Sequence, residues 1–448
     1  MQSENNLLKD DLKPIFLKYL IASVGGMLGT ALYVLADTLF VANGIGSEGL
    51  TALNISIPMM NVFNGLGLLF GIGGATAISI SKGQKREDEI NQIFTLSVGM
   101  SVVAGIIFTL LGAFFLDDIC RLLGASGEIL VMSKDYLGVI MTFSIVFLLN
   151  STMTIFIRND GAPGLAMWGM LAGTISNIAL DYIFIFVFNW GMWGAAFATA
   201  LAPIISLSIL STHFIRKKNT VKIQWSVPKK HIIKRIFGNG MSSFITELSA
   251  GVVIFAFNIA ILGLIGDIGV AAYGIIANLS LICIAIFTGI GQALQPISSI
   301  NYGAGKKERV RETLKLALIA GAIFGVVFFA IGMIFPGALA AIFNKDNDPE
   351  LARITINGIY IYFICFIFMG VNTVMVSYLQ SIEKSRLATI ISLARGLGLV
   401  IVGLIVLTKL FGINGVWLTM PFAEGLTFVG LVVTMRIVDS GGTVHKSK

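Results

Sequence analysis

The feature that most limits the possible folds is a series of twelve long apolar stretches separated by short polar segments. A helix needs about 20 apolar residues to cross the hydrocarbon core of a bilayer. Of the 448 residues, 56% are hydrophobic and only 12% are charged, whereas soluble proteins average about 25% charged residues. A soluble domain of this size could not bury so much apolar surface. The sequence therefore predicts an all-α integral membrane protein.

The predicted spans are helices of roughly the length that a bilayer requires. They cover residues 15–42, 52–80, 93–116, 135–157, 163–188, 191–215, 235–263, 271–299, 312–336, 354–380, 386–409 and 414–437. Most of the 31 lysines and arginines lie in the even-numbered loops and at the two ends of the chain. Because basic loops stay on the cytoplasmic side, we expect both termini in the cytoplasm of a multi-pass plasma-membrane protein, the inner membrane of a bacterial cell.

The two halves of the sequence repeat one another. Gly71 recurs as Gly291, and Gly83 recurs as Gly303. Gly83 and Gly303 each begin a basic loop. Chance similarity between helices rich in Gly, Leu and Ala is the alternative explanation. Near-constant spacing instead favours two pseudo-symmetric, parallel six-helix bundles around a central cleft. The predicted division is an N-terminal bundle at 1–215 with a cation-coupling site, a cytoplasmic linker loop at 216–234 and a C-terminal bundle at 235–448.

Charge and cysteine content exclude several classes of function. The net charge is +7, but the basic residues lie between apolar runs and lack the interleaved aromatic residues of a nucleic-acid groove. The three cysteines are scattered and have no metal-binding spacing. We expect no nucleic-acid partner, no structural metal and no cofactor.

Ionisable residues inside the bilayer are costly and are therefore functional candidates. Asp37, Asp181 and Thr199 fall at one depth in the outer half of the first bundle, and Tyr33 and Asn177 each precede an acid by four residues. Side chains at this spacing share a helix face. Two facing carboxylates cannot both ionise cheaply, so they titrate as a pair. The group could take up a proton or, with the amide and hydroxyl oxygens, hold Na⁺; the alternative is a polar cluster that only fixes helix packing.

The repeat does not duplicate this polar group. Asp37 aligns with Phe257, Asp181 with Gly403, and Thr199 with Met420. We therefore expect the proton or ion site in the first half alone.

Three further ionisable residues lie near the middle of predicted spans. Glu247 could face the cleft and attract a cationic substrate, with Met59 and Asn61 as further cleft residues, or it could be a structural acid. Arg395 and Glu424 are predicted to form a structural ion pair between two helices.

Several segments carry a resemblance to a known family. LADTLFVANGIG at 35–46, IRNDGAPGLAMWGMLAGTISNIALDYIFIF at 157–186 and WGAAFATALA at 193–202 resemble the multidrug and toxic compound extrusion (MATE) transporters, most closely the bacterial DinF/MepA-like branch. The resemblance covers nearly the whole chain. It implies secondary active efflux of organic, often cationic, compounds by antiport with H⁺ or Na⁺ through alternating access.

The resemblance also implies a set of site residues. The cation-coupling group would be Asp37, Asn177, Asp181 and Thr199, with a span-4 contribution from Asn150, Ser151 or Thr154. Other branches use an acid in span 7, where this chain has Glu247, and an Asp in span 10, where this chain has Asn372. Some relatives bend span 1 at a mid-helix proline, whereas here Pro14 lies only at its start.

Two other functions compete with drug efflux. One is a lipid-linked-precursor flippase of the same superfamily, although such flippases line their cavity with several basic residues and here only Arg395 is basic within a span. The other is an intramembrane aspartyl protease with Asp37 and Asp181 as its dyad, but no GxGD motif surrounds either acid. We therefore expect a monomeric transporter rather than an enzyme, with small organic cations and drugs as substrates and the lipid bilayer as its surroundings.

Overall fold

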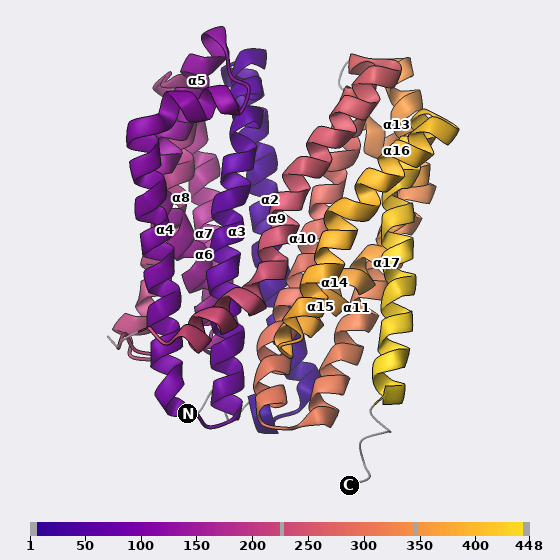
Figure 1. The fold of residues 1–448 in the computed structure, drawn as a ribbon. Helices are drawn as coiled ribbons and strands as arrows, with labels where there is room; N and C mark the ends of the chain where they lie inside the picture. The colour runs from indigo at the N-terminus through magenta and orange to yellow at the C-terminus, as the bar shows by residue number, and fades with distance from the viewer. Residues whose placement is uncertain (1–6, 225–227, 345–346, 442–448) are drawn as a thin grey trace.

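The computed structural model describes residues 7–224, 228–344 and 347–441, and its helices are arranged in two groups (Figure 1). Within the described residues, ten helices are long and apolar enough to cross a membrane, and the number rises to twelve if each of two bent helix pairs forms one span. The predicted all-helical, membrane-spanning fold is confirmed in this form. The first half of the chain forms the indigo and magenta group, and the second half forms the orange and yellow group.

The first half begins with three helices that are each longer than a bilayer requires, and it contains one broken span. Its elements are α2 (Leu12–Gly44), α3 (Ser47–Gly83), α4 (Glu87–Leu122), α5 (Gly127–Thr142), α6 (Ser144–Asn159), α7 (Pro163–Tyr182), the π-helix η1 (Ile183–Val187) and α8 (Gly191–Ile215). The predicted fourth span is the bent pair α5–α6, whose two parts meet at 54°.

The second half repeats this order. Its elements are α9 (Lys230–Ile265), α10 (Asp267–Gly303), α11 (Lys307–Ile334), the short α12 (Pro336–Ala341), α13 (Pro349–Tyr362), α14 (Cys365–Ser381), α15 (Ser385–Leu393), the π-helix η2 (Ala394–Gly398), α16 (Leu399–Phe411) and α17 (Ile413–Gly441). The predicted tenth span is the bent pair α13–α14, with an angle of 49°. Spans four and ten, which occupy equivalent places in the two halves, are therefore both broken.

A pair of glycines shows why the loops that precede the last long helix of each half have the same shape. Gly191 opens α8 and Gly412 precedes α17, and both have a φ of +56°. Residues with a side chain rarely adopt this left-handed conformation, whereas glycine adopts it readily. The repeated glycines thus fix equivalent turns before the last long helix of each half.

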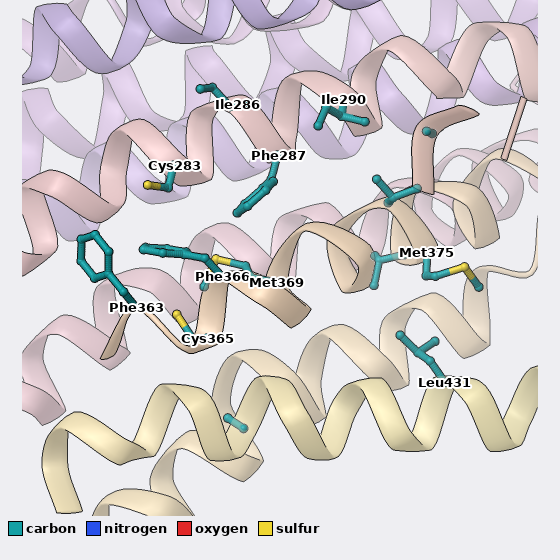
Figure 2. Packing of buried hydrophobic residues seen from close by; sticks show 14 of the residues in the cluster. Cys283, Ile286, Phe287, Ile290, Phe363, Cys365, Phe366, Met369, Met375 and Leu431 are labelled. Atoms are coloured by element: carbon teal, nitrogen blue, oxygen red, sulfur yellow. The ribbon is translucent and has the colours of Figure 1, made fainter. Parts of the chain in front are cut away.

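Several clusters of buried apolar side chains hold the helices together, and one of them belongs mainly to the second half. The core of the second half includes Phe287, Phe363 and Phe366, with Cys283 and Cys365 beside them (Figure 2). The rings of Phe363 and Phe366 meet edge to face, with their centroids 4.9 Å apart. The start of α2 also packs into this core, so the first long helix contacts both halves.

Small residues allow the two halves to approach closely. A Cβ on Gly73 of α3 would overlap the carbonyl oxygen of Ile236 in α9, and a Cβ on Gly240 of α9 would overlap that of Leu69. Such close backbone packing is typical of small residues at membrane helix interfaces.

Further along α3, the repeated glycines Gly83 and Gly303 meet one another. A Cβ on Gly83 would overlap the carbonyl oxygen of Ile300, and a Cβ on Gly303 would overlap that of Ile80. The basic ends of α3 and α10 are therefore in direct backbone contact, which joins the two halves at this end of the molecule.

Candidate functional site

The four residues of the predicted coupling group are all buried in the first half. Asp37 lies in α2, Asn177 and Asp181 lie in α7, and Thr199 lies in α8. Asp181 and Asn177 have no exposed surface, and Asp37 is 6% exposed. Asn177 Nδ2 donates a hydrogen bond to Thr199 Oγ1 at 3.5 Å, which ties α7 to α8. The charges of Asp37 and Asp181 are close enough to interact.

Several acceptor oxygens of this group have no hydrogen-bond partner. Within the described part of the chain, they are Asp37 Oδ1, Asn177 Oδ1 and both carboxylate oxygens of Asp181. A buried acceptor without a partner costs free energy, and native proteins usually satisfy such atoms. Four such oxygens within one small group therefore provide acceptors for a proton or a hard cation.

Two tyrosines adjoin the acids. Tyr33, one turn before Asp37, lies within electrostatic range of Asp37, Asp181 and Glu247. Tyr136, in α5, is 2% exposed, and its hydroxyl lies against Thr199 and within range of both aspartates. The sequence analysis missed Tyr136 because a tyrosine at the outer end of a predicted span reads as an interfacial aromatic residue.

Helix geometry changes immediately after Asp181. The α-helix ends at Tyr182 and continues as the π-helix η1 over Ile183–Val187. π-Helical turns are rare and are found frequently at functional sites. The span-4 candidate Asn150, in α6, is partly buried, and its Oδ1 also has no hydrogen-bond partner among the described residues.

The aligned positions of the second half hold no equivalent polar group. Phe257 is fully buried and stacks on Tyr273, with ring centroids 4.9 Å apart. Met420 packs against the apolar core of the second half. A Cβ on Gly403 would touch the side chain of Thr419. The space that is polar in the first half is thus filled by apolar packing in the second.

Two of the three predicted cleft residues, Glu247 and Asn61, lie along the contact between α3 and α9. Glu247 Oε2 accepts a hydrogen bond from Asn64 Nδ2 at 3.2 Å. Asn61 approaches Gly251 closely on the same pair of helices. Met59 instead packs against apolar clusters of the first half. Glu247 therefore belongs to the interface between the halves, with a polar partner that the sequence analysis had not identified.

Arg395 and Glu424 lie together within the second half. Arg395 Nε is 2.6 Å from Glu424 Oε1, and its Nη2 donates to Thr373 Oγ1 at 3.0 Å. Asn372 Nδ2 donates to Glu424 Oε2 at 2.7 Å. Glu424 is 2% exposed, so this carboxylate is buried with a cation and an amide donor. Arg395 lies within the π-helix η2.

A second buried charged cluster lies at the basic end of the first half, where the sequence analysis assigned no site. Asp160, in the turn between α6 and α7, is 2.9 Å from Lys82 Nζ and 2.9 Å from His213 Nε2. The backbone N–H of Thr220 donates to the same carboxylate at 2.9 Å. Burial alone would raise the pKa of Asp160, but the hydrogen bonds from His213, Thr220 and Lys82, with the charge of Lys82, hold this pKa at about 2.

Comparison with known proteins places this geometry in a family. The MatE family model matches residues 22–183 and 243–406, which together make up most of the chain. The chain therefore belongs to the MatE family. The starts of the two matched segments are separated by nearly the same number of residues as the repeated glycines Gly71 and Gly291.

Individual relatives cover almost the whole chain. Multidrug export protein MepA of Staphylococcus saprophyticus is 28% identical and covers 94% of this chain and 93% of its own length. MepA of Staphylococcus aureus strain MSSA476 is also 28% identical, with 97% and 96% covered. A solved structure of the MATE multidrug transporter DinF-BH is 31% identical, covers 96% of each chain and superposes with a TM-score of 0.88.

A more distant structure agrees in fold. The outward-facing conformation of a MATE family transporter of the MOP superfamily has a TM-score of 0.90 at 22% identity and covers 97% of this chain and 98% of its own. The family match and the MepA relatives identify the protein as a multi-pass membrane transporter, as predicted from the resemblance, and not an enzyme.

Proposed function

We propose that this protein exports organic compounds, many of them cationic, in exchange for H⁺ or Na⁺ through alternating access. The observation that carries the coupling part of this proposal is the buried pair Asp37 and Asp181, whose oxygens include three acceptors without a hydrogen-bond partner among the described residues. The names of the MepA relatives and of DinF-BH support multidrug export.

The buried pair suits coupling because its charge can change. A carboxylate pair in a dry site favours uptake of a proton or binding of a cation that neutralises it. An ion drives transport only if it binds one conformation better than the other. If these oxygens are exposed when the protein opens to one side of the membrane and buried when it opens to the other, the two conformations bind the ion with different affinities.

The proposed motion uses the contact between the halves. Backbone contact at Gly83 and Gly303 closes the basic end of the molecule. We place this end, with both termini, on the cytoplasmic face of a bacterial plasma membrane, and we propose that one chain acts as a monomer. Opening of this contact would give substrate access from the cytoplasm.

The experiment is substrate export from proteoliposomes under separately imposed proton and sodium gradients. Asp37→Asn and Asp181→Asn should each reduce ion-driven export to near background, because the amide preserves size but removes the titrating charge. Asp117→Asn is the matched control, since Asp117 is an exposed acid paired with Arg121 and Lys134. Export with unaltered dependence on pH and sodium in both buried-acid variants would refute the proposal.

Glu247 offers a separate test of substrate charge. Glu247→Gln should lower export of cationic substrates relative to neutral ones by about fivefold or more, corresponding to ~1 kcal/mol of charge attraction. The hydrogen bond to Asn64 can survive this change, because the amide retains an acceptor oxygen. Equal losses for cationic and neutral substrates of similar size would assign Glu247 a structural role.

A further inference from the structure

A basic pocket of about 620 Å³ opens between the start of α9 and the loop that joins α14 to α15. Four of its lining residues are Lys234, Arg235, Lys384 and Arg386, and the imidazole of His231 joins them. This pocket lies apart from the buried aspartates, and the transport proposal does not use it.

The acid in the pocket leaves most of this positive charge uncompensated. Glu383 accepts hydrogen bonds from Arg235 and from Asn239. Arg235 and His231 each also lie 3.5 Å from a carboxylate oxygen of Glu89 in α4. Across the described ranges of the chain, neither Lys234, Lys384 nor Arg386 takes part in an ion pair, so three cations remain available to an anionic ligand.

The apolar surroundings indicate the kind of anion. Leu387 lines the pocket beside Arg386. Ile390, four residues after Arg386 on the same face of α15, is 63% exposed, and Phe237, three residues after Lys234 on α9, is 37% exposed. Both helices continue into membrane-spanning segments. A ligand held here would therefore meet cations at its head and exposed apolar side chains one helical turn deeper.

We propose that this pocket binds the phosphate headgroup of an anionic phospholipid, with its acyl chains along the exposed faces of α9 and α15. Basic pockets between membrane helices recognise such headgroups through charge, with each lysine or arginine contributing roughly a fivefold gain in affinity. The volume suits a glycerophosphate group. A soluble phosphate would use the same cations but not the apolar faces.

The site also lies at the junction of the two halves. Arg235, which lines the pocket, donates to Ser81 of α3 at 2.9 Å and pairs with Glu383 of the second half. A headgroup beside Arg235 would thus contact the residues that join the halves at the basic end.

The test uses the full chain, purified in a nonionic detergent and analysed by native mass spectrometry with added phosphatidylglycerol or phosphatidylcholine of identical acyl chains. The wild type should retain one phosphatidylglycerol in preference to phosphatidylcholine. The variant K234Q/K384Q/R386Q should bind it at least tenfold more weakly. The charge-retaining variant K234R/K384R/R386K should bind it within about threefold of the wild type, which shows that the pocket folds.

The matched control is K307Q/R311Q/K315Q, which removes three exposed basic residues from α11 at the same end of the molecule. It should leave phosphatidylglycerol retention unchanged. Equal losses in the pocket variant and this control would overturn the site. Displacement of phosphatidylglycerol by inorganic phosphate or glycerol 3-phosphate at comparable concentrations would overturn the lipid as ligand and assign the pocket to a soluble anion.

Discussion

The buried pair Arg395 and Glu424 makes a quantitative prediction about stability. The two groups are 2.6 Å apart, and Glu424 is only 2% exposed. Removal of one partner of a buried ion pair leaves the other charge uncompensated, at a cost of about 3–5 kcal/mol. Glu424→Gln and Arg395→Gln should therefore each lower the free energy of unfolding by that amount.

The double variant should be less damaging than the sum of the two. It buries two neutral amides, which are cheaper in the membrane than one lone charge, so we expect it within about 2 kcal/mol of the wild type. The coupling energy between the positions should then be at least about 4 kcal/mol in favour of the pair, because the two single losses together far exceed the loss in the double variant. The measurement is unfolding of the purified protein in mixed micelles titrated with a denaturing detergent.

The chain provides a matched control for burial. Asp117 and Arg121 are also 2.6 Å apart, but their side chains are 45% and 59% exposed. Solvent screening should make the same double-mutant cycle at this pair too small to resolve. A coupling energy at Arg395 and Glu424 that is no larger than at the exposed pair would refute the reasoning from burial.

Two further perturbations test other parts of the structure. Asp160→Asn should lower the stability by about 3–5 kcal/mol in a thermal melt. Because the pKa of Asp160 is depressed from 3.8 to about 2, its contribution is present above the unfolded pKa and is lost only as pH falls through the folded one. The deficit should therefore be full at about pH 6 and smaller at about pH 2, and a deficit as large at about pH 2 as at about pH 6 would contradict this assignment. Gly83→Ala should push α3 away from Ile300, lengthen the spin-label distances between the ends of α3 and α10, and slow export. Gly99→Ala, at an open position, should have none of these effects. Unchanged distances in the Gly83 variant would show that this contact does not close the basic end.

Much of the fold could be predicted because the bilayer constrains it strongly. Backbone groups inside a bilayer must form their hydrogen bonds within the chain, so a long apolar stretch there is expected to be a helix. The breaks in spans four and ten could not be read in this way. The bend between α5 and α6 falls at Phe143 and Ser144, where neither proline nor glycine marks it.

The candidate coupling site was accessible to sequence reasoning for a different reason. Asp37 and Asp181 are rare, costly residues within apolar helices, and their depth follows from the fixed rise of a helix. Tyr136 is an ordinary residue for the end of a span, so only its burial beside Thr199 in the structure reveals its place in the site. Asp160 and His213 lie far apart in the sequence, and no local pattern predicts their contact.

The two halves share one fold but distribute their buried charge differently. In the first half, two buried acids lie within electrostatic range of one another, with acceptor oxygens that lack hydrogen-bond partners among the described residues. In the second half, Glu424 is held by Arg395 and Asn372, so its charge is already compensated. An acid beside a fixed cation gains little from proton uptake, whereas two facing acids gain much. Of these two buried groups, the acid pair of the first half can therefore change its charge at the lower cost, and this difference is the reason that we propose it, and not the compensated pair of the second half, for ion coupling.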